Sequence, residues 1–425
     1  ECRLLVYLKV IGVVFFNGLK LIIIPLVTSS IVLAVANMGG QSGFGRLGLK
    51  TLGYYMATST IAIMIGLVLV NVVRPGDTGS GKPLFNAATA QKVRAEAAAL
   101  ASTARPTTGT DFLDVFRQMI PPNPVAAAVE GNLLGLIVVS LLVGYFLTKL
   151  VGNPRTVMSD FWQAMYDISM KVTDLVLKFA PLGVGMMIAA TVAENYARLK
   201  PDDRFTEFGT SLVTFIMTLV AAAAIHTFIV MPIILATVAR VNPLRHIRAM
   251  APAMMTAFST ASSSATLPVT LDCVEKRSGV SNRTASFVLP LGATVNMDGT
   301  ALYECVAAIF IVQAFGIDLS FGQQFFVVMV ALLTSVGVAG VPSASLVAIV
   351  IILQSLSNQL RAQGIEAPLA EVGIPILLVF DRLLDMCRTA VNVFSDSCGA
   401  VVVGKSEGEA GILTDHVTDH VAAAE

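Results

Sequence analysis

The stretch DRLLDMCRTAVNVFSDSCGAVVV, residues 381–403, places charged residues inside an otherwise apolar segment. Its polar members are spaced by four, three, four and four positions, and they are Asp381, Asp385, Arg388, Asn392 and Asp396. At 3.6 residues per turn these positions share one face of an α-helix, and the opposite face is apolar. A charge at the bilayer centre costs at least ~2.5–3.5 kcal/mol. We therefore expect a helix whose polar face meets a cavity or a protein partner, not lipid.

The composition places this helix in a membrane. The chain has 425 residues, of which 55% are hydrophobic and 13% charged, and its mean hydropathy is +0.77. Soluble domains carry about 25% charged residues. Apolar runs longer than the ~20 residues that cross a bilayer recur, and they do not alternate in polarity as barrel strands do. We predict an all-α, multi-pass integral protein of the cell (inner) membrane.

Charge and cysteine content exclude other classes. The formal net charge is +0, which gives a nucleic-acid partner no electrostatic basis. The five cysteines form no CxxC pair and no even framework, so we expect neither a bound metal cofactor nor disulfides.

Two segments of the C-terminal half are interrupted near their centres. Residues 251–271 contain a serine cluster, and residues 319–360, which carry no charge, are broken by GVAGVPSAS at 337–345. Each is followed by a helix with polar groups in its interior, GATVNMDGTALYE (292–304) and the 381–403 stretch. Broken segments in corresponding places of two halves are typical of a transporter binding site. We predict re-entrant helical hairpins near 245–275 and 320–360, with two ordinary kinked helices as the alternative.

The two polar helices carry a surplus of acids. Asp298 and Glu304 join the three aspartates of the 381–403 stretch, which makes five acids to one base. Such a surplus requires imported cations, or else protonation. Hard cations such as Na⁺ bind the oxygens that carboxylates and amides offer.

Arg388 has a separate predicted role. Its planar fork matches a carboxylate, Asp385 could hold an ammonium, and the serines at 262–264 could meet a second carboxylate. An acidic amino acid has these three groups. The alternative is that Arg388 only pairs with Asp385 or Asp381 and joins the helix bundle.

Four motifs in order, SSSATLPVT, PLGATVNMDGTALY, GVAGVPSAS and DRLLDMCRTAVNVFSD, resemble the dicarboxylate/amino acid:cation symporter family, which includes excitatory amino acid transporters and archaeal aspartate transporters. The resemblance implies an elevator-type homotrimer in membrane lipid, without enzymatic activity and with Na⁺ as coupling ion. Each protomer would have a scaffold and a mobile transport domain. The second hairpin would be the outer gate.

The resemblance also implies site residues. Substrate would be held by Ser263, Thr300, Val341, Ser345, Asp385, Arg388, Thr389 and Asn392. One sodium would use Gly292, Asn296, Asn392 and Asp396. A second would use Thr294 with backbone around Ser335, Val336 and Val338. A third would use Tyr55, Thr58, Ser59, Asn296 and Asp298. Glu304, where proton-coupled relatives have glutamate, would carry a co-transported proton.

The expected organisation follows the same resemblance. Residues 1–50 would be scaffold helices with the first family helix missing, 51–75 a transport-domain helix, 76–125 an extramembrane loop, 126–200 scaffold helices, 201–403 the transport domain, and 404–425 a polar cytoplasmic tail.

The sequence thus predicts a sodium-coupled symporter of aspartate or glutamate, with proton co-transport as a further hypothesis. A C4-dicarboxylate or neutral amino acid symporter of the same fold is the alternative. A remote alternative is an intramembrane protease, which two aspartates on separate helices could suggest. No histidine or lysine lies near the serine cluster in the sequence to act as its base.

Overall fold

The computed structural model describes residues 3–38, 46–77, 84, 120–130, 133–179, 182, 186, 201–335, 345–362, 365 and 367–414. Regular structure within these ranges consists of helices, which confirms the all-α prediction. Among the described residues, three helical segments are long and apolar enough to cross a membrane: Arg46–Val73, Thr206–Ala239 and Asn282–Ala314.

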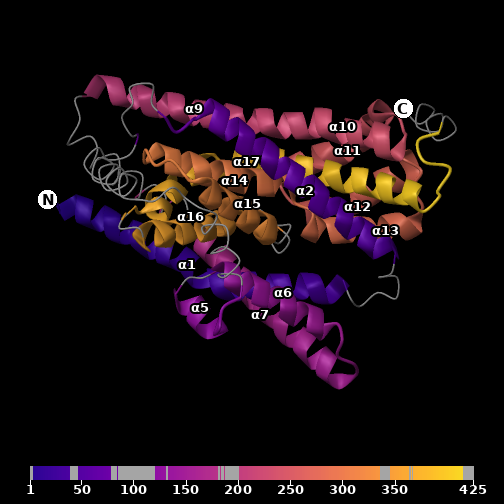
Figure 1. Ribbon diagram of the computed structural model, residues 1–425, viewed down its shortest axis with the longest axis horizontal. Coiled ribbons are helices and arrows are strands. Elements are labelled where there is room, and N and C mark those ends of the chain that lie inside the picture. Colours follow the sequence, from indigo (N-terminus) through magenta and orange to yellow (C-terminus); the bar gives the residue numbers. More distant parts are fainter. Residues whose placement is uncertain are drawn as a thin grey trace.

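The helices form two groups (Figure 1). In the smaller group α1 (Arg3–Met38) packs against α6 (Leu133–Leu147) and α7 (Asn153–Lys178), and the short α5 (Pro124–Glu130) lies on α6. The larger group contains the remaining elements. They are α2 (Arg46–Val73), α9 (Pro201–Ile225), η1 (His226–Val230), α10 (Met231–Ile234), η2 (Leu235–Ala239), α11 (Pro243–Thr260), α12 (Ser263–Asp272), η3 (Cys273–Arg277), α13 (Asn282–Val295), α14 (Asp298–Ala314), α15 (Phe321–Ser335), α16 (Ser345–Ala362) and α17 (Leu369–Ser406). The groups meet where α1 contacts α13 and α16 and where α6 contacts α15.

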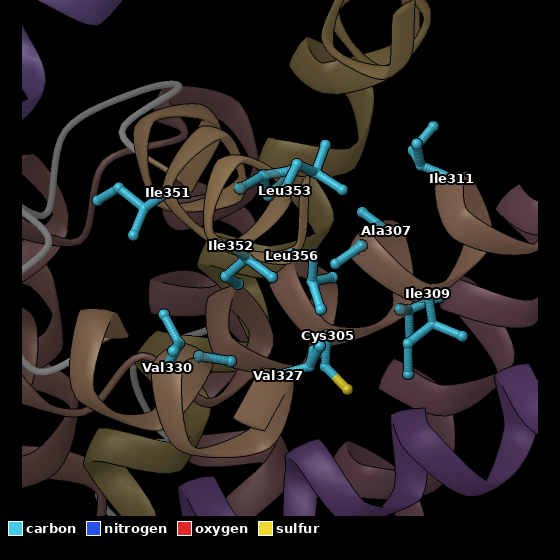
Figure 2. Packing of buried hydrophobic residues seen from close by; sticks show 14 of the residues in the cluster. Cys305, Ala307, Ile309, Ile311, Val327, Val330, Ile351, Ile352, Leu353 and Leu356 are labelled. Carbon is cyan, nitrogen blue, oxygen red and sulfur yellow. The ribbon is translucent and has the colours of Figure 1, made fainter. Parts of the chain in front are cut away.

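Helix α14 lies at the centre of the larger group. It packs against α2, α9, α15, α16 and α17, and all of its residues are buried. Figure 2 shows its side chains Cys305 and Ala307 toward Val327 of α15 and Leu356 of α16, and all four belong to one buried cluster. Burial on every side explains why its apolar residues follow no helical stripe. Its polar residues must therefore be satisfied inside the protein.

The serine cluster lies at a sharp reversal between α11 and α12. Ala261 ends α11 in the left-handed region with φ 50°. Ser262 then caps α12, because its side chain accepts a hydrogen bond from the backbone N–H of Ala265 at 3.2 Å. The two helices pack against each other. The second interrupted segment likewise forms two packed helices, α15 and α16, and its central residues 336–344 lie outside the described ranges.

A third interruption divides the NMDGT motif. Asn296 and Met297 have non-helical backbone angles, φ −108° with ψ 85° and φ −114° with ψ 62°. The prediction of one helix across residues 292–304 is wrong at these two positions. The break places the C-terminal end of α13 next to the N-terminal end of α14, beside the polar face of α17.

Candidate functional site

Helix α17 presents its polar face to the protein interior. Asp381, Asp385, Arg388, Asn392 and Asp396 are all buried, at 7% relative exposure or less. Leu383, on the apolar face, is 55% exposed. The polar residues are thus buried while an apolar residue of the opposite face is exposed, which confirms the helix face that the spacing predicts.

Arg388 is held between two carboxylates and an aromatic ring. Its Nη2 donates to Oδ1 of Asp385 at 2.8 Å and to Oδ1 of Asp381 at 3.1 Å. Its guanidinium carbon lies 3.9 Å from the ring centroid of Tyr303 on α14. Nε and Nη1 of Arg388 have no hydrogen-bond partner within the described part of the chain. The stacked ring fixes the guanidinium plane, and the N–H groups of Nε and Nη1 remain available as donors in that plane.

Asn392 joins α17 to the beginning of α14. Its Oδ1 accepts the backbone N–H of Gly299 at 2.8 Å, and its Nδ2 donates to the hydroxyl of Thr300 at 3.2 Å. The first N–H groups of a helix have no partner in their own helix. Asn392 accepts a hydrogen bond from one of these N–H groups, and this fixes the axial position of α14 relative to α17.

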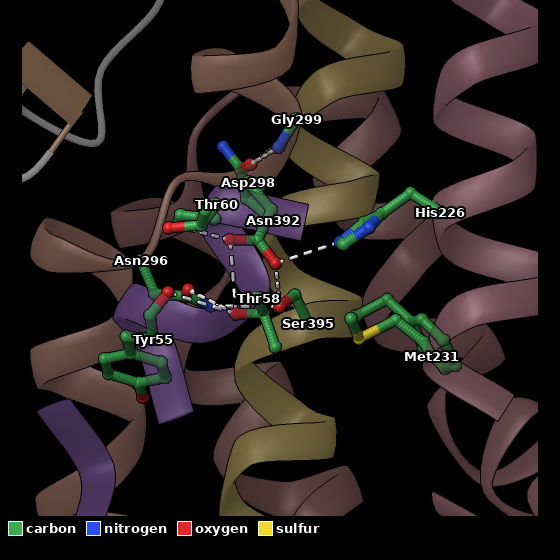
Figure 3. Close-up of polar contacts among 12 residues, drawn as sticks. Tyr55, Thr58, Thr60, His226, Met231, Asn296, Asp298, Gly299, Asn392 and Ser395 are labelled. Carbon is green, nitrogen blue, oxygen red and sulfur yellow. Dashed lines mark hydrogen bonds and ion pairs between the residues drawn. The ribbon is translucent and has the colours of Figure 1, made fainter. Parts of the chain in front are cut away.

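Asp298 is surrounded by four donors (Figure 3). Its Oδ1 accepts from Ser59 at 2.6 Å and from Thr58 at 3.4 Å, both on α2. Its Oδ2 accepts from Ser395 at 2.6 Å and from Nε2 of His226 at 3.0 Å. Each oxygen of Asp298 thus has two hydrogen-bond partners, one pair on α2 and the other on α17 and η1.

Asn296 lies between Asp298 and Asp396. Its Nδ2 donates to Oδ1 of Asp396 at 2.8 Å and to Ser395 at 3.1 Å, and its Oδ1 accepts from Thr58 at 3.4 Å. Gly292 lies against the same group: a Cβ there would be 2.5 Å from Oδ1 of Asp396 and 2.6 Å from the hydroxyl of Tyr55. Only glycine leaves room for this approach.

The Tyr55 hydroxyl donates to the carbonyl of Val288 at 2.7 Å. Carboxylate, amide and hydroxyl oxygens from α2, α14, α17 and the α13–α14 break therefore converge around Asn296. This oxygen-rich set suits a hard cation such as Na⁺.

Glu304 is also buried on α14, between one and two turns after Asp298. Its Oε2 accepts the hydroxyl of Thr334 on α15 at 2.7 Å, and its Oε1 has no hydrogen-bond partner among the described residues. A carboxyl group with one neutral donor is a suitable place for a proton.

The remaining predicted residues lie in several places. Ser263 is buried at the start of α12, and the Thr389 hydroxyl donates to the carbonyl of Asp385 at 2.8 Å. Ser335 and Ser345 are buried at the facing ends of α15 and α16. The Thr294 side chain is exposed and donates to the carbonyl of Leu291 at 3.0 Å, away from the buried centre. Val336, Val338 and Val341 lie outside the described residues.

Sequence reasoning missed four side chains of this centre: His226, Tyr303, Thr334 and Ser395. Ser395 precedes Asp396 and follows Asn392 by three positions, so its spacing on the polar face was available as a signal. His226 is a lone histidine in an apolar segment, and no local pattern connects it with Asp298.

A membrane bundle with buried acids beside broken helices defines a membrane transport protein. Comparison with known families agrees: the model of the sodium:dicarboxylate symporter family matches residues 3–406, and the chain belongs to that family. The match confirms the resemblance found in the motifs and makes the chain an integral membrane protein.

Several named proteins are similar over most of their length. Excitatory amino acid transporter 3 of Homo sapiens is 34% identical over 443 residues, covering 93% of this chain and 78% of that protein. An excitatory amino acid transporter of Caenorhabditis elegans is 32% identical over 441 residues, covering 94% and 81%. Excitatory amino acid transporter 1 of Ambystoma tigrinum is 32% identical over 454 residues, covering 94% and 77%.

Proposed function

We propose that the chain is a sodium-coupled symporter of acidic amino acids, aspartate or glutamate, in the cell membrane. The observation that carries the substrate assignment is the buried Arg388, held over Tyr303 with Nε and Nη1 unpartnered among the described residues. The planar guanidinium thus keeps N–H donors on two of its nitrogens that can bind the oxygens of a carboxylate. Family membership and the names of the relatives support the same assignment.

Cargo binding would rearrange the ion pairs of α17. Asp385 receives Nη2 of Arg388 in the present arrangement. An amino acid could bring its side-chain carboxylate to Arg388 and its ammonium to Asp385, so that each buried charge keeps a partner. Thr389 and Asn392, one turn apart on the same face, would contact the backbone end of the amino acid, with Ser263 at the tip of the α11–α12 pair.

Sodium would bind to the oxygens around Asn296. One ion would use Asp298 with Thr58, Ser59 and Tyr55, and another would use Asp396 with Asn392 and the α13 end at Gly292. Unwound backbone between two half-helices is a recurrent way to expose carbonyls to a cation inside a membrane. A third ion would lie between Thr294 and the end of α15 near Ser335, where the outer gate would close.

Coupling would follow from shared elements. Helix α14 carries Asp298 at its start and Tyr303 against the guanidinium of Arg388. A cation bound at Asp298 and an amino acid bound at Arg388 would therefore favour the same position of this helix. Two ligands that stabilise one state increase each other's affinity by an equal factor.

The mechanical part of the proposal is an elevator in a homotrimer surrounded by lipid. The group of α1, α5, α6 and α7 would be the scaffold, and the larger group, with re-entrant pairs α11–α12 and α15–α16, would move as the transport domain. Glu304, linked to α15 through Thr334, would take up a proton during the cycle.

The test is uptake of radiolabelled aspartate into proteoliposomes with and without an inward sodium gradient. We expect uptake that requires the gradient and that unlabelled glutamate suppresses. Competition by succinate alone would indicate a C4-dicarboxylate carrier, and competition by serine alone a neutral amino acid carrier. Uptake independent of sodium would refute the coupling.

A further inference from the structure

The two oxygens of Asp298 face different parts of the protein. Oδ1 faces the hydroxyls of Thr58 and Ser59 on α2, which belong to the proposed cation site. Oδ2 faces away from α2 and is held by Ser395 of α17 and His226 of η1 (Figure 3). One oxygen is thus available to a cation, while the other is fixed by donors that belong to neither the substrate set nor the sodium sets named above.

Ser395 orients two members of the cation site at once. Its hydroxyl donates to Oδ2 of Asp298 at 2.6 Å and accepts from Nδ2 of Asn296 at 3.1 Å. The second bond turns the amide of Asn296 so that its Oδ1 points toward Thr58, at 3.4 Å. Ser395 is completely buried, so no water competes for its hydroxyl.

His226 supports the same oxygen from the other side. A carboxylate only accepts, so Nε2 of His226 carries the proton in this hydrogen bond. The imidazole comes from η1, a π-helical turn in the helix that continues α9. Such turns occur frequently at functional sites, because the wider turn changes the direction of a side chain. Nδ1 of His226 has no hydrogen-bond partner within the described ranges, so the ring is held mainly through Asp298.

We propose that Ser395, assisted by His226, is a positioning residue that sets the affinity of the Asn296–Asp298 site for its cation. The inference rests on the proposed function, in which that cation is sodium. Groups behind the ligands of a metal site fix the ligands' orientation, and their loss typically lowers affinity by about 10–100-fold. Ser395 has this relation to both Asp298 and Asn296.

The chain offers a matched control on the same helix. Ser397 is also completely buried, but its hydroxyl donates to the carbonyl of Phe394 at 2.6 Å and lies 2.9 Å from Nε2 of His246. Within the described residues its hydroxyl forms no hydrogen bond with Asn296 or Asp298. Ser397→Ala therefore removes an equally buried hydroxyl without disturbing the cation site.

The experiment is a sodium titration of thermal unfolding of the purified full chain, without amino acid and with choline replacing sodium at constant ionic strength. We expect Ser395→Ala to raise the sodium concentration for half-maximal stabilisation about tenfold, and Ser397→Ala to lower the unfolding temperature without moving that midpoint. A parallel Li⁺ titration should show a changed Na⁺/Li⁺ midpoint ratio in Ser395→Ala only, which a purely structural loss would not produce.

Two results would overturn the inference while leaving the proposed function standing. One is a wild-type midpoint and ion ratio in Ser395→Ala, and the other is an equal shift in both serine variants. A wild-type protein that sodium does not stabilise at all would instead remove the cation site itself, and the inference with it.

Discussion

Replacing Arg388 with lysine tests the substrate assignment most directly. Lysine keeps the positive charge between Asp381 and Asp385, so the ion pairs of α17 survive. An ammonium is a single point charge, however, and cannot keep these ion pairs while placing further N–H donors where Nε and Nη1 of the planar guanidinium lie. A hydrogen bond between charged groups contributes about 1.5–3 kcal/mol. Loss of one such bond to the cargo should therefore weaken apparent aspartate affinity roughly 10- to 150-fold.

The assay is the aspartate concentration dependence of uptake into proteoliposomes at saturating sodium. Arg382→Lys is the matched control, because Arg382 lies on the same helix but its side chain is exposed. We expect the control to behave as wild type. An unchanged midpoint in Arg388→Lys, or an equal loss in the control, would refute the idea that the unpartnered donors of this guanidinium bind the cargo.

Three further variants test other parts of the structure. Glu304→Gln should abolish the pH dependence of uptake, since an amide cannot exchange a proton in this range; a wild-type pH profile would contradict the proton role. Gly292→Ala should lower stability by about 1–3 kcal/mol and weaken sodium stabilisation in thermal unfolding, because its Cβ would lie 2.5 Å from Oδ1 of Asp396; unimpaired sodium stabilisation would count against the site. Burial alone would raise the pKa of Glu409, but hydrogen bonds from Ser281 and Thr284 outweigh it and the pKa is lowered. Glu409 therefore stabilises the fold above its unfolded-state pKa, and this contribution disappears as the pH falls through the folded-state pKa; unfolding measured from neutral to acid pH should lose less stability in Glu409→Gln than in wild type.

The helix class and the polar face of α17 were predictable from sequence because both depend on local spacing. Positions 381 to 396 at intervals of three and four define one face whatever surrounds the helix. The position of the reversal at Ala261 was predictable, since the serine cluster interrupts an apolar run. The left-handed backbone conformation of Ala261 was not predictable, because alanine has no preference for φ 50°.

The break at Asn296–Met297 and the contact between His226 and Asp298 were beyond sequence reasoning for a different reason. The break is stabilised by partners distant in sequence: Ser395 and Asp396 bind the Asn296 side chain across about one hundred positions. His226 reaches Asp298 across 72 positions. Tertiary hydrogen bonds of this kind override local helix preference, and a lone histidine in an apolar segment gives no indication of which carboxylate it will meet.

The five buried acids differ in the number of hydrogen-bond donors and positive groups that the protein supplies to each. Asp381 and Asp385 share Arg388, and Asp298 accepts from four donors. In the described structure Asp396 and Glu304 each receive a single hydrogen bond from a neutral group, the amide of Asn296 and the hydroxyl of Thr334. One neutral donor does not offset the cost of burying a negative charge. The need for imported positive charge is therefore greatest at these two carboxyl groups. The surroundings of each suit a different solution: oxygens from several elements gather beside Asp396, whereas Glu304 lies among apolar residues of α14 and α15. A metal cation at the first and a proton at the second would neutralise both, which explains physically why one carrier would couple its cargo to two kinds of ion.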